Sequence, residues 1–313
     1  MTVDGGGRAL IDAHRAAGSM FSAGGVSSFV RAEGDGTPVV LVHGLPVSSY
    51  LYRKVLPELA ARGLRGVAFD LPGMGLADRP VSFDYRIAGL GEFAAAAVDA
   101  LGLSSFHLVV HDAGGPVGFE LIRRRPASIR SLTILDTMVE IPKRPFPGEV
   151  WARLTSTAGP ILRSPKLWQQ LMRRVGVADQ TSLSDAEIDA HRLLGLGDDD
   201  AAGYLRIMSA VARSRRAGSY ADVVDTRRVP YPVQVLWGAS DPILTLKGHG
   251  LAMLEATGLP ALNVTPGRHY IQEDNAPLIA SMVADLAAVT DRSTGAEPEQ
   301  RRLTGRFAPR RRG

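Results

Sequence analysis

Short apolar runs that alternate with helical stretches are the feature that most constrains the fold of this 313-residue chain. Continuous apolar runs of this length are typical of parallel strands that are buried on both faces. The runs are Pro38–Gly44, Arg65–Asp70, Phe106–Asp112, Ser131–Asp136, Pro232–Gly238 and Ala261–Thr265. Helical stretches follow most of them, at about residues 48–62, 86–101, 113–125, 246–257 and 273–289. This alternation predicts an α/β fold with a mostly parallel, doubly wound sheet, preceded by a β-hairpin at Met20–Glu33.

The alternation stops between Glu140 and about Arg228, where only helical patterns occur, among them Ser184–Leu194 and Ala201–Arg215. An all-helical segment inside an α/β chain is most simply an inserted cap. We therefore predict a core in two parts, residues 1–139 and 229–290, with a helical cap at 140–228 and a tail at 291–313.

The composition excludes several kinds of site. A hydrophobic content of 45% is enough for a sizeable core, and the absence of cysteine excludes disulfides, thiolate metal sites and cysteine nucleophiles. The first residues lack a basic segment leading into an apolar one, and no run of about 18 apolar residues occurs. We expect a cytoplasmic protein that does not bind membranes.

The formal net charge of +4 is located entirely in the last residues of the chain. Between Asp291 and Gly313 there are seven arginines against three acidic residues, so the remainder of the chain is neutral overall. A segment rich in proline, glycine and arginine with few apolar residues cannot offset its ordering entropy. We predict a disordered basic tail and no nucleic-acid partner, with binding of phosphates through this tail as an alternative.

The stretch Leu108–Glu120 places a carboxylate at a strand-to-helix turn, a position that often carries a functional residue in α/β folds. An apolar strand ends at Asp112, Gly114 and Gly115 follow, and the pattern then becomes helical. Asp112 is thereby presented on a sharp turn between a buried strand and a helix N-terminus. An aspartate in such a turn is often only a turn or capping residue, so its function depends on what lies near it.

Polar residues follow other strands of the predicted sheet. His43 and Gly44 end one run, Asp241 follows another, and His269 comes after the last. In open α/β sheets, functional groups gather at the carboxyl ends of the strands. Asp112, Asp241 and His269 thus follow the order nucleophile, acid, histidine along the chain. The nucleophile position is an aspartate, and the chain has no G-x-S-x-G motif. Because an aspartate is already ionised at neutral pH, it does not need a base before it attacks.

Five motifs together resemble the α/β-hydrolase fold superfamily, and within it the aspartate-nucleophile branch of epoxide hydrolases and haloalkane dehalogenases. They are H-G-L-P (43–46), D-L-P-G-M-G-L-A-D-R-P (70–80), H-D-A-G-G-P-V-G (111–118), W-G-A-S-D-P (237–242) and G-R-H-Y-I-Q-E-D (267–274). The resemblance covers about residues 20–140 and 228–290 and is weak in the cap. It predicts an α/β-hydrolase fold with an inserted helical cap and a catalytic triad.

The resemblance also implies a mechanism without a cofactor or a metal. Asp112 displaces a leaving group from carbon, and His269, oriented by Asp241, activates water to hydrolyse the ester so formed. The backbone N–H groups of Leu45 and Ala113 are expected to form the oxyanion hole. A carboxylate that attacked an ordinary ester would give an anhydride, so the substrate is expected to be an alkylating electrophile. Asp136, which also ends a strand, is an alternative acid.

The positions of the halide ligands favour an epoxide over a halide. Haloalkane dehalogenases hold the departing halide with a tryptophan directly after the nucleophile and with an asparagine, glutamate or tryptophan elsewhere. Here Ala113 and Leu45 occupy two such positions, and neither side chain donates a hydrogen bond. Epoxide hydrolases hold the ring oxygen with phenols, usually two, from the cap. Tyr204 is the first choice for one phenol and Tyr220 the second.

No tyrosine lies between Glu140 and Ala190 to supply the other phenol. The second ligand of the ring oxygen would then be His191 or Trp168, or would be absent. We predict an epoxide hydrolase that acts on an apolar small molecule with water, as a monomer or homodimer. A haloalkane dehalogenase-like enzyme is the first alternative. A non-covalent binder or a cofactor-free acid–base enzyme is the second. Structural roles are expected for three histidines of the core, His43, His107 and His111.

Overall fold

The computed structural model describes residues 3–140, 164–197, 201–212, 214 and 219–293. Its strands are β1 (Ser19–Ala23), β2 (Val26–Glu33), β3 (Thr37–Val42), β4 (Leu64–Phe69), β5 (Phe106–Asp112), β6 (Ile129–Thr137), β7 (Val233–Gly238) and β8 (Asn263–Thr265). They form one sheet in the order β1-β2-β4-β3-β5-β6-β7-β8. From β4 onward in this order, neighbouring strands are parallel. At the other edge, β1 pairs antiparallel with β2, and β2 pairs antiparallel with β4. The predicted sheet class and the predicted hairpin are both confirmed.

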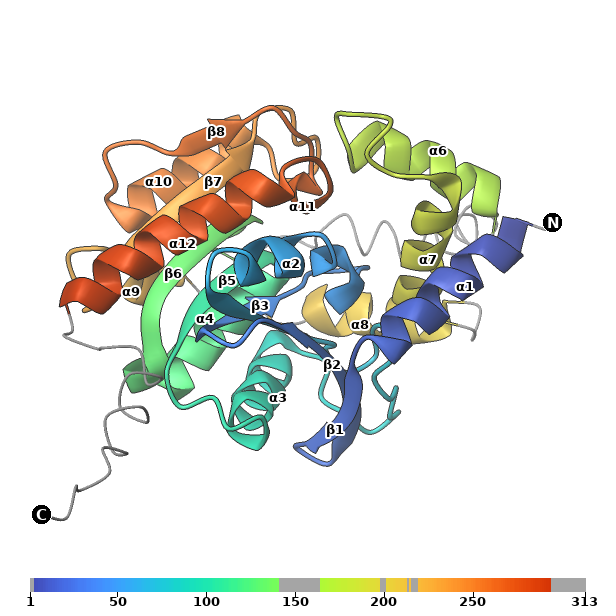
Figure 1. The fold of residues 1–313 in the computed structure, drawn as a ribbon, viewed down its shortest axis with the longest axis horizontal. Helices are drawn as coiled ribbons and strands as arrows, with labels where there is room; N and C mark the ends of the chain where they lie inside the picture. The colour runs from blue at the N-terminus through green and yellow to red at the C-terminus, as the bar shows by residue number, and fades with distance from the viewer. Residues whose placement is uncertain (1–2, 141–163, 198–200, 213, 215–218, 294–313) are drawn as a thin grey trace, which may run out of the picture.

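Helices cover both faces of this sheet (Figure 1). The α-helices are α1 (Val3–Ala16), α2 (Val55–Ala60), α3 (Ile87–Ala100), α4 (Gly114–Arg124), α6 (Pro165–Val175), α7 (Asp185–Leu196), α8 (Ala202–Ala212), α9 (Ala221–Val224), α10 (Leu251–Thr257), α11 (Ile271–Asp274) and α12 (Ala276–Ser293). Three short turns of other helix types are η1 (Ser49–Tyr52), η2 (Pro126–Ser128) and η3 (Leu246–Gly250). Helices α2 and α12 pack on one face, and α3, α4 and α10 on the other.

Strand β3 shows why its apolar run is continuous. Val39 and Leu41 are buried against α2 and α12, while Val40 and Val42 are buried in the cluster on the opposite face. Successive side chains of a strand point to opposite faces, so a strand covered on both sides needs apolar residues at every position. Each such side chain contributes roughly 1.5–3 kcal/mol when it is fully buried.

Two predicted helices are each divided in the structure. The stretch 48–62 forms η1 and α2, and the stretch 273–289 forms α11 and α12. Pro57 lies in the first turn of α2 and Pro277 in the first turn of α12. Proline has no N–H to donate and is tolerated only near a helix start, so a continuous helix is interrupted before it. Helix α12 reaches Ser293, three residues into the predicted tail, and the remainder of that tail lies outside the described residues.

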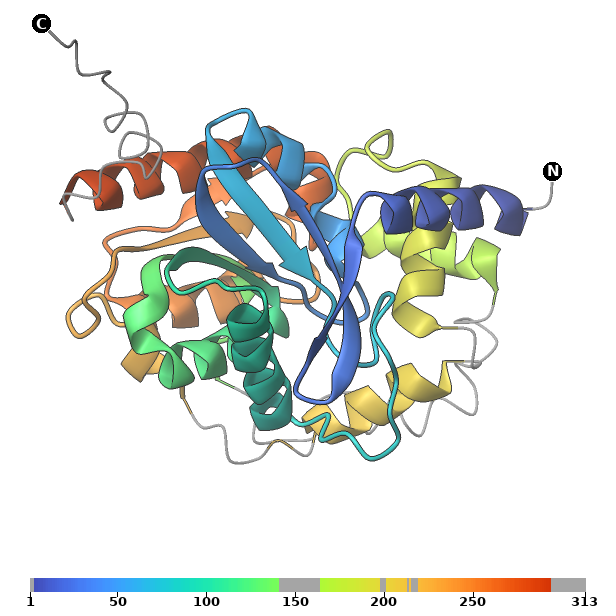
Figure 2. The same ribbon diagram turned by 60° about the horizontal axis from the view of Figure 1, so that its bottom comes forward.

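Of the helices in the described part of the predicted cap, α6, α7 and α8 lie beyond the carboxyl ends of the strands (Figure 1). Helix α9 instead packs on α4 and α10 of the core. Helix α1, which the sequence did not indicate, lies along α7 (Figures 1 and 2). The two helices approach closely at glycines: a Cβ atom on Gly6 would lie 3.1 Å from that of Ala186, and one on Gly7 3.0 Å from that of Asp189. The N-terminal helix therefore supports the cap.

Candidate active site

Asp112 lies at the end of β5 in a strained backbone conformation that the packing around it maintains. Its φ of 51° lies in the left-handed region, which costs a residue other than glycine about 1–3 kcal/mol. A Cβ atom on Gly114 would lie 2.4 Å from the carbonyl oxygen of Val42, and one on Gly115 1.9 Å from Oγ1 of Thr137. The two glycines let the turn approach its neighbouring strands, and the turn raises the Asp112 carboxylate above the edge of the sheet.

The Asp112 carboxylate has two different surroundings. Its Oδ1 accepts a hydrogen bond of 2.9 Å from the backbone N–H of Leu45. Its Oδ2 lies 3.5 Å from Nε2 of His269. Burial alone would raise the pKa of Asp112, but the interactions with His269 hold it below its ordinary value. The carboxylate is therefore an anion at neutral pH, although only 8% of the residue is exposed.

His269 is held between two carboxylates. Its Nδ1 lies 2.8 Å from Oδ2 of Asp241. The other oxygen of Asp241 accepts hydrogen bonds from the backbone N–H groups of Ile243, at 2.7 Å, and Leu244, at 3.0 Å. Burial alone would lower the pKa of His269, but its contacts with Asp112 and Asp241 raise it to about 10. The resting site therefore contains an imidazolium between two anions.

Asp136, the alternative acid of the sequence analysis, is not the partner of His269. Its Oδ1 accepts a 2.8 Å hydrogen bond from the N–H of Gly238, and its Oδ2 has no hydrogen-bond partner among the described residues. Burial, and then the negative charge of Asp241, raise the pKa of Asp136 well above its ordinary value. Asp136 is therefore a buried acid behind the site, bonded to Gly238 and not to His269, and Asp241 occupies the position of the orienting carboxylate.

The loop that carries Leu45 is fixed by His43. The backbone N–H of Leu71 donates to Nε2 of His43 at 2.9 Å, so the proton of this ring is on Nδ1, which lies 2.8 Å from the carbonyl oxygen of Gly44. This placement fits the predicted structural role. It also aims the N–H of Leu45 at Asp112, as an oxyanion hole requires. Ala113, the other predicted donor, directly follows Asp112 and begins the turn into α4.

The two other core histidines also make buried contacts. His111 Nε2 lies 2.8 Å from the carbonyl oxygen of His269 and so supports the segment that carries this side chain. His107 Nδ1 lies 2.7 Å from Oγ of Ser131 on the neighbouring strand. Burial lowers the pKa of each ring to about 4, so both are neutral at physiological pH.

Tyr204 is the cap residue that the structure brings toward Asp112. It lies on α8, whose Ile207 packs so closely on the loop after β4 that a Cβ atom on Gly73 would be 2.5 Å from Cδ1 of Ile207. Burial, and then the negative charge of Asp112, raise the pKa of Tyr204. The raised pKa keeps its hydroxyl protonated at neutral pH, and no described residue hydrogen-bonds that hydroxyl.

Two other predicted cap residues lie elsewhere. The hydroxyl of Tyr220 is 3.3 Å from Oε1 of Glu120 on α4, and the ring packs under an arginine of the same helix. His191 Nε2 lies 2.8 Å from the carboxylate of Glu273. The Tyr220 hydroxyl and His191 Nε2 thus already have partners, whereas His191 Nδ1 has none among the described residues. A role for either residue as an oxygen ligand stays a prediction. The sequence pattern does not show which neighbours these two side chains meet.

The structure adds Tyr270, which the sequence analysis passed over. Its ring centroid lies 5.1 Å from that of His269, and it is buried in the same apolar cluster as Trp168. Burial, then the charge of Asp112 and then Tyr204, raise the pKa of Tyr270 well above its ordinary value. An aromatic residue directly after the catalytic-type histidine was the available signal. Trp168 itself is buried, and its Nε1 has no hydrogen-bond partner among the described residues.

The comparisons with known proteins place this geometry in a family. A family model described as the α/β hydrolase fold matches residues 37–276. The chain belongs to the α/β-hydrolase superfamily. A haloalkane dehalogenase of Mesorhizobium japonicum is 30% identical over 281 residues, which are 82% of this chain and 86% of that protein. One of Psychrobacter cryohalolentis is 27% identical over 269 residues, 80% of this chain and 84% of that protein. This α/β-hydrolase is therefore a hydrolytic enzyme of the dehalogenase-like branch.

Solved structures agree with this fold. A haloalkane dehalogenase of Bradyrhizobium elkani superimposes with a TM-score of 0.66 at 22% identity, covering 87% of this chain and 99% of the other. A meta-cleavage product hydrolase of Pseudomonas fluorescens superimposes with a TM-score of 0.71 at 20% identity, covering 87% and 97%. At these identities the likeness establishes the fold of the hydrolase and not its substrate.

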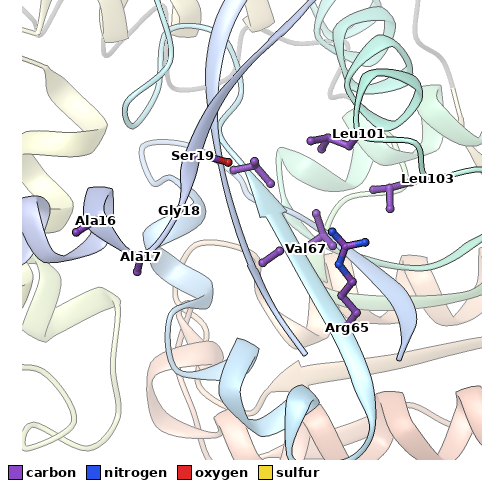
Figure 3. Close-up of a pocket in the computed structure, with 10 residues that line it drawn as sticks. Ala16, Ala17, Gly18, Ser19, Arg65, Val67, Leu101 and Leu103 are labelled. Atoms are coloured by element: carbon purple, nitrogen blue, oxygen red, sulfur yellow. The ribbon is translucent and has the colours of Figure 1, made fainter. Parts of the chain in front are cut away.

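A separate pocket of about 440 Å³ lies away from this site (Figure 3). Figure 3 shows Arg65 and Val67 of β4 beside Leu101 and Leu103, which follow α3. Arg65 is near the start of β4, whereas Asp112 ends β5, so the pocket is toward the opposite ends of the parallel strands.

Over the described residues, no group of three or more His, Cys, Asp or Glu side chains could hold a metal ion. In that same part of the chain, no helix is long and apolar enough to span a membrane.

Proposed function

We propose that this α/β-hydrolase opens an epoxide on a small apolar molecule through a covalent ester on Asp112. The observation that carries the proposal is the row Asp112–His269–Asp241, with distances of 3.5 Å and 2.8 Å. Tyr204 adds a phenol that is close enough for the charge of Asp112 to raise its pKa. The kinship with haloalkane dehalogenases supports displacement at carbon. The choice of an epoxide rests on Leu45 and Ala113, whose side chains cannot hold a halide.

The first step is attack by Asp112 on a ring carbon. Because Oδ1 is held by the N–H of Leu45, Oδ2, which faces His269 and accepts no backbone hydrogen bond, is the oxygen that forms the new C–O bond. The bond between that carbon and the ring oxygen breaks, and the ring oxygen takes the electron pair. A phenol supplies the proton that this oxygen needs. Tyr204, Tyr270 and Tyr52 all lie close enough for the charge of Asp112 to raise their pKa, but the hydroxyl of Tyr52 already donates to the carbonyl oxygen of Val42, which leaves Tyr204 and Tyr270. The product of this step is a hydroxyalkyl ester and a phenolate.

The second step needs a neutral His269. Once Asp112 is an ester, one of the two anions beside His269 is gone, and the imidazolium can return a proton to the phenolate. Neutral His269, oriented by Asp241, then accepts a proton from water as the water attacks the ester carbonyl. The carbonyl oxygen is already bound to the N–H of Leu45, and Ala113 is proposed as the second donor. Loss of one such donor typically costs 10²–10³-fold in rate. Collapse releases the diol and restores Asp112 and the imidazolium.

A haloalkane dehalogenase-like activity is the second candidate, and the relatives named above favour it. The ester on Asp112 and its hydrolysis would be the same, but a halide leaves without a proton. Trp168 supports this reading, because its buried Nε1–H has no hydrogen-bond partner among the described residues. The indole N–H is a donor only, and a halide accepts from such a group.

The mass of the Asp112 peptide tests the proposal. His269→Gln should stop the second step and let the ester accumulate. We would incubate this variant with a panel of epoxides and alkyl halides and weigh the peptide. An epoxide adds its whole mass, whereas an alkyl halide adds its mass less that of the hydrogen halide. Asp112→Asn in the same background is the control and should add nothing.

The outcomes separate the three readings. Adducts from epoxides support the proposal, and adducts from halides alone favour the second candidate. If no substrate in a broad panel adds mass, the ester mechanism is wrong and a non-covalent binder or a cofactor-free acid–base enzyme becomes the better explanation. As an independent check, turnover by the unaltered protein in ¹⁸O-water should label Asp112 as well as the product.

A further inference from the structure

The carboxylate of Glu273 is a buried junction of charges four residues beyond His269. Its side chain has no exposed surface. Oε1 lies 2.5 Å from Nη1 of Arg53 and 2.8 Å from Nε2 of His191, and Oε2 lies 2.9 Å from Nζ of Lys54 and 3.0 Å from Nη2 of Arg53. The mechanism proposed above uses none of these four residues, so the purpose of the junction needs a separate explanation.

The contacts of this junction come from three different segments. Arg53 and Lys54 directly follow η1 and so continue the chain that begins with the Leu45 loop. His191 belongs to the cap helix α7, and Glu187 of the same helix accepts a second bond of 2.6 Å from Arg53. Glu273 itself belongs to α11, directly behind His269 and Tyr270. One carboxylate therefore ties the oxyanion segment, the cap and the histidine segment together.

Backbone hydrogen bonds continue this seam to the histidine itself. The N–H of His269 donates to the carbonyl oxygen of Val175 at 3.2 Å, and that of Tyr270 donates to Gly176 at 2.7 Å. Val175 ends α6 of the cap, so the cap and the segment of His269 share a short stretch of paired backbone. The ring of His191 lies parallel to that of Tyr270, at an angle of 5° and 6.2 Å between centroids.

A buried ion cluster is weak evidence for stability, because desolvation of the charges offsets much of their attraction. Its stronger consequence is geometric. Each charged side chain reaches its partner from only one position, so if one element slid past another, a buried charge would lose its partner. We propose that Glu273 is a positioning residue, which fixes the cap helix α7 and the turn of His269 in one register above Asp112. The proposal rests on the role assigned to Asp112 only for its effect on the reaction rate.

The effect reaches Tyr204 through the cap. Helix α7 packs against α8, which carries Tyr204, so a shift of α7 moves the phenol relative to Asp112. A misplacement of about 1 Å by a change far from the reacting atoms can cost on the order of 10²-fold in rate. Loss of the Glu273 charge should therefore slow ester formation at saturating substrate and not only weaken binding.

Glu273→Gln tests this inference, because it keeps the shape of the side chain and removes its charge. The matched control is Glu120→Gln, which removes an arginine-paired, largely buried carboxylate on α4, away from the cap junction. Both changes are made in the His269→Gln background, and ester formation on Asp112 is timed by mass at saturating epoxide. Each variant is assayed equally far below its own unfolding midpoint. We expect Glu273→Gln to slow ester formation at least about tenfold and Glu120→Gln to leave it unchanged.

Hydrogen–deuterium exchange gives a reading that does not depend on the reaction. With His269 present, Glu273→Gln should speed exchange of the amides of His269 and Tyr270 and of helix α7, and Glu120→Gln should not. If the parent variant forms no ester, the proposed function fails and exchange alone decides the role of Glu273. Unchanged exchange at this seam, or equal ester rates in both variants, overturns the inference.

A second variant covers the case in which Glu273→Gln does not fold. His191→Phe keeps a ring against Tyr270 and removes only the cap arm of the junction. Ester formation should again slow, by less than with Glu273→Gln, and exchange in α7 should rise. If His191→Phe folds and changes neither measurement, Glu273 does not position the cap.

Discussion

The charge of His269 depends on a carboxylate that the proposed reaction converts into an ester. Two unit charges at the observed 3.5 Å attract each other by roughly 4–5 kcal/mol at an effective dielectric constant of about 20. Each pKa unit corresponds to about 1.4 kcal/mol, so the Asp112 charge contributes about three units. Asp112→Asn imitates the neutral ester without changing the shape of the side chain. The pKa of His269, about 10 in the resting protein, should then fall to about 7.

Nitrogen NMR of labelled imidazoles measures this change directly. The chain has seven histidines, and the spectrum of His269→Gln identifies the signal that belongs to His269. In the unaltered protein this ring should stay charged to about pH 9, whereas in Asp112→Asn it should lose its proton near neutral pH. A ring that titrates near 6.5 in the unaltered protein would refute the proton scheme. A ring that is still charged at about pH 9 in Asp112→Asn would refute it equally.

The same shift has a consequence for stability. A histidine whose pKa is raised on folding stabilises the folded state below its unfolded pKa of 6.5, and this contribution is lost as the pH rises toward about 10. The free energy of unfolding should therefore fall between about pH 7 and pH 10, and fall less in Asp112→Asn. Asp112 acts in the opposite range: its lowered pKa adds stability above 3.8 that is lost in acid. Denaturant titrations at several pH values check both signs.

Four further substitutions test separate parts of the site. Asp241→Asn should slow ester hydrolysis by about 10²–10⁴-fold, whereas Asp136→Asn, which replaces a residue bonded to Gly238 and not to His269, should change it little; single-turnover kinetics compares them. Gly115→Ala should destabilise the fold by about 1–3 kcal/mol in denaturant titration, because its methyl group would lie 1.9 Å from Oγ1 of Thr137. Tyr204→Phe should slow ester formation from epoxides by about 10²-fold and leave any reaction with alkyl halides unchanged, as timed by the mass of the Asp112 peptide.

Sequence patterns predicted the sheet well because its strands leave few alternatives. A run such as Val39–Val42, apolar at every position, fits only a strand covered on both faces. The turn at Asp112 was equally well specified, since two glycines and a following helix restrict its shape. His269 and Asp241 could be paired because the carboxyl ends of parallel strands meet at one edge. The pairing they show, at 2.8 Å, needed no knowledge of the cap.

The cap was harder to predict, because helical periodicity does not say which neighbour a face will meet. Tyr220 and Tyr204 are both tyrosines of the cap segment, and only tertiary packing separates the one bonded to Glu120 from the one near Asp112. Helix α1 was missed because three consecutive glycines, Gly5–Gly7, are poor helix formers. At Gly6 and Gly7 the lack of a side chain lets α7 approach, which is a property of the pair of helices and not of the segment.

The order in which the ribosome makes this chain sets a condition on α1. An isolated helix of 14 residues is marginal in water, and glycine costs it about 1 kcal/mol per residue relative to alanine. Its partner α7 begins at Asp185, so α1 leaves the ribosome long before the surface that stabilises it exists. Helix α1 should therefore complete its docking late. During translation the glycine face of α1 has no partner helix until α7 has been made. The cap is therefore supported by α1 only after most of the sheet has been synthesised.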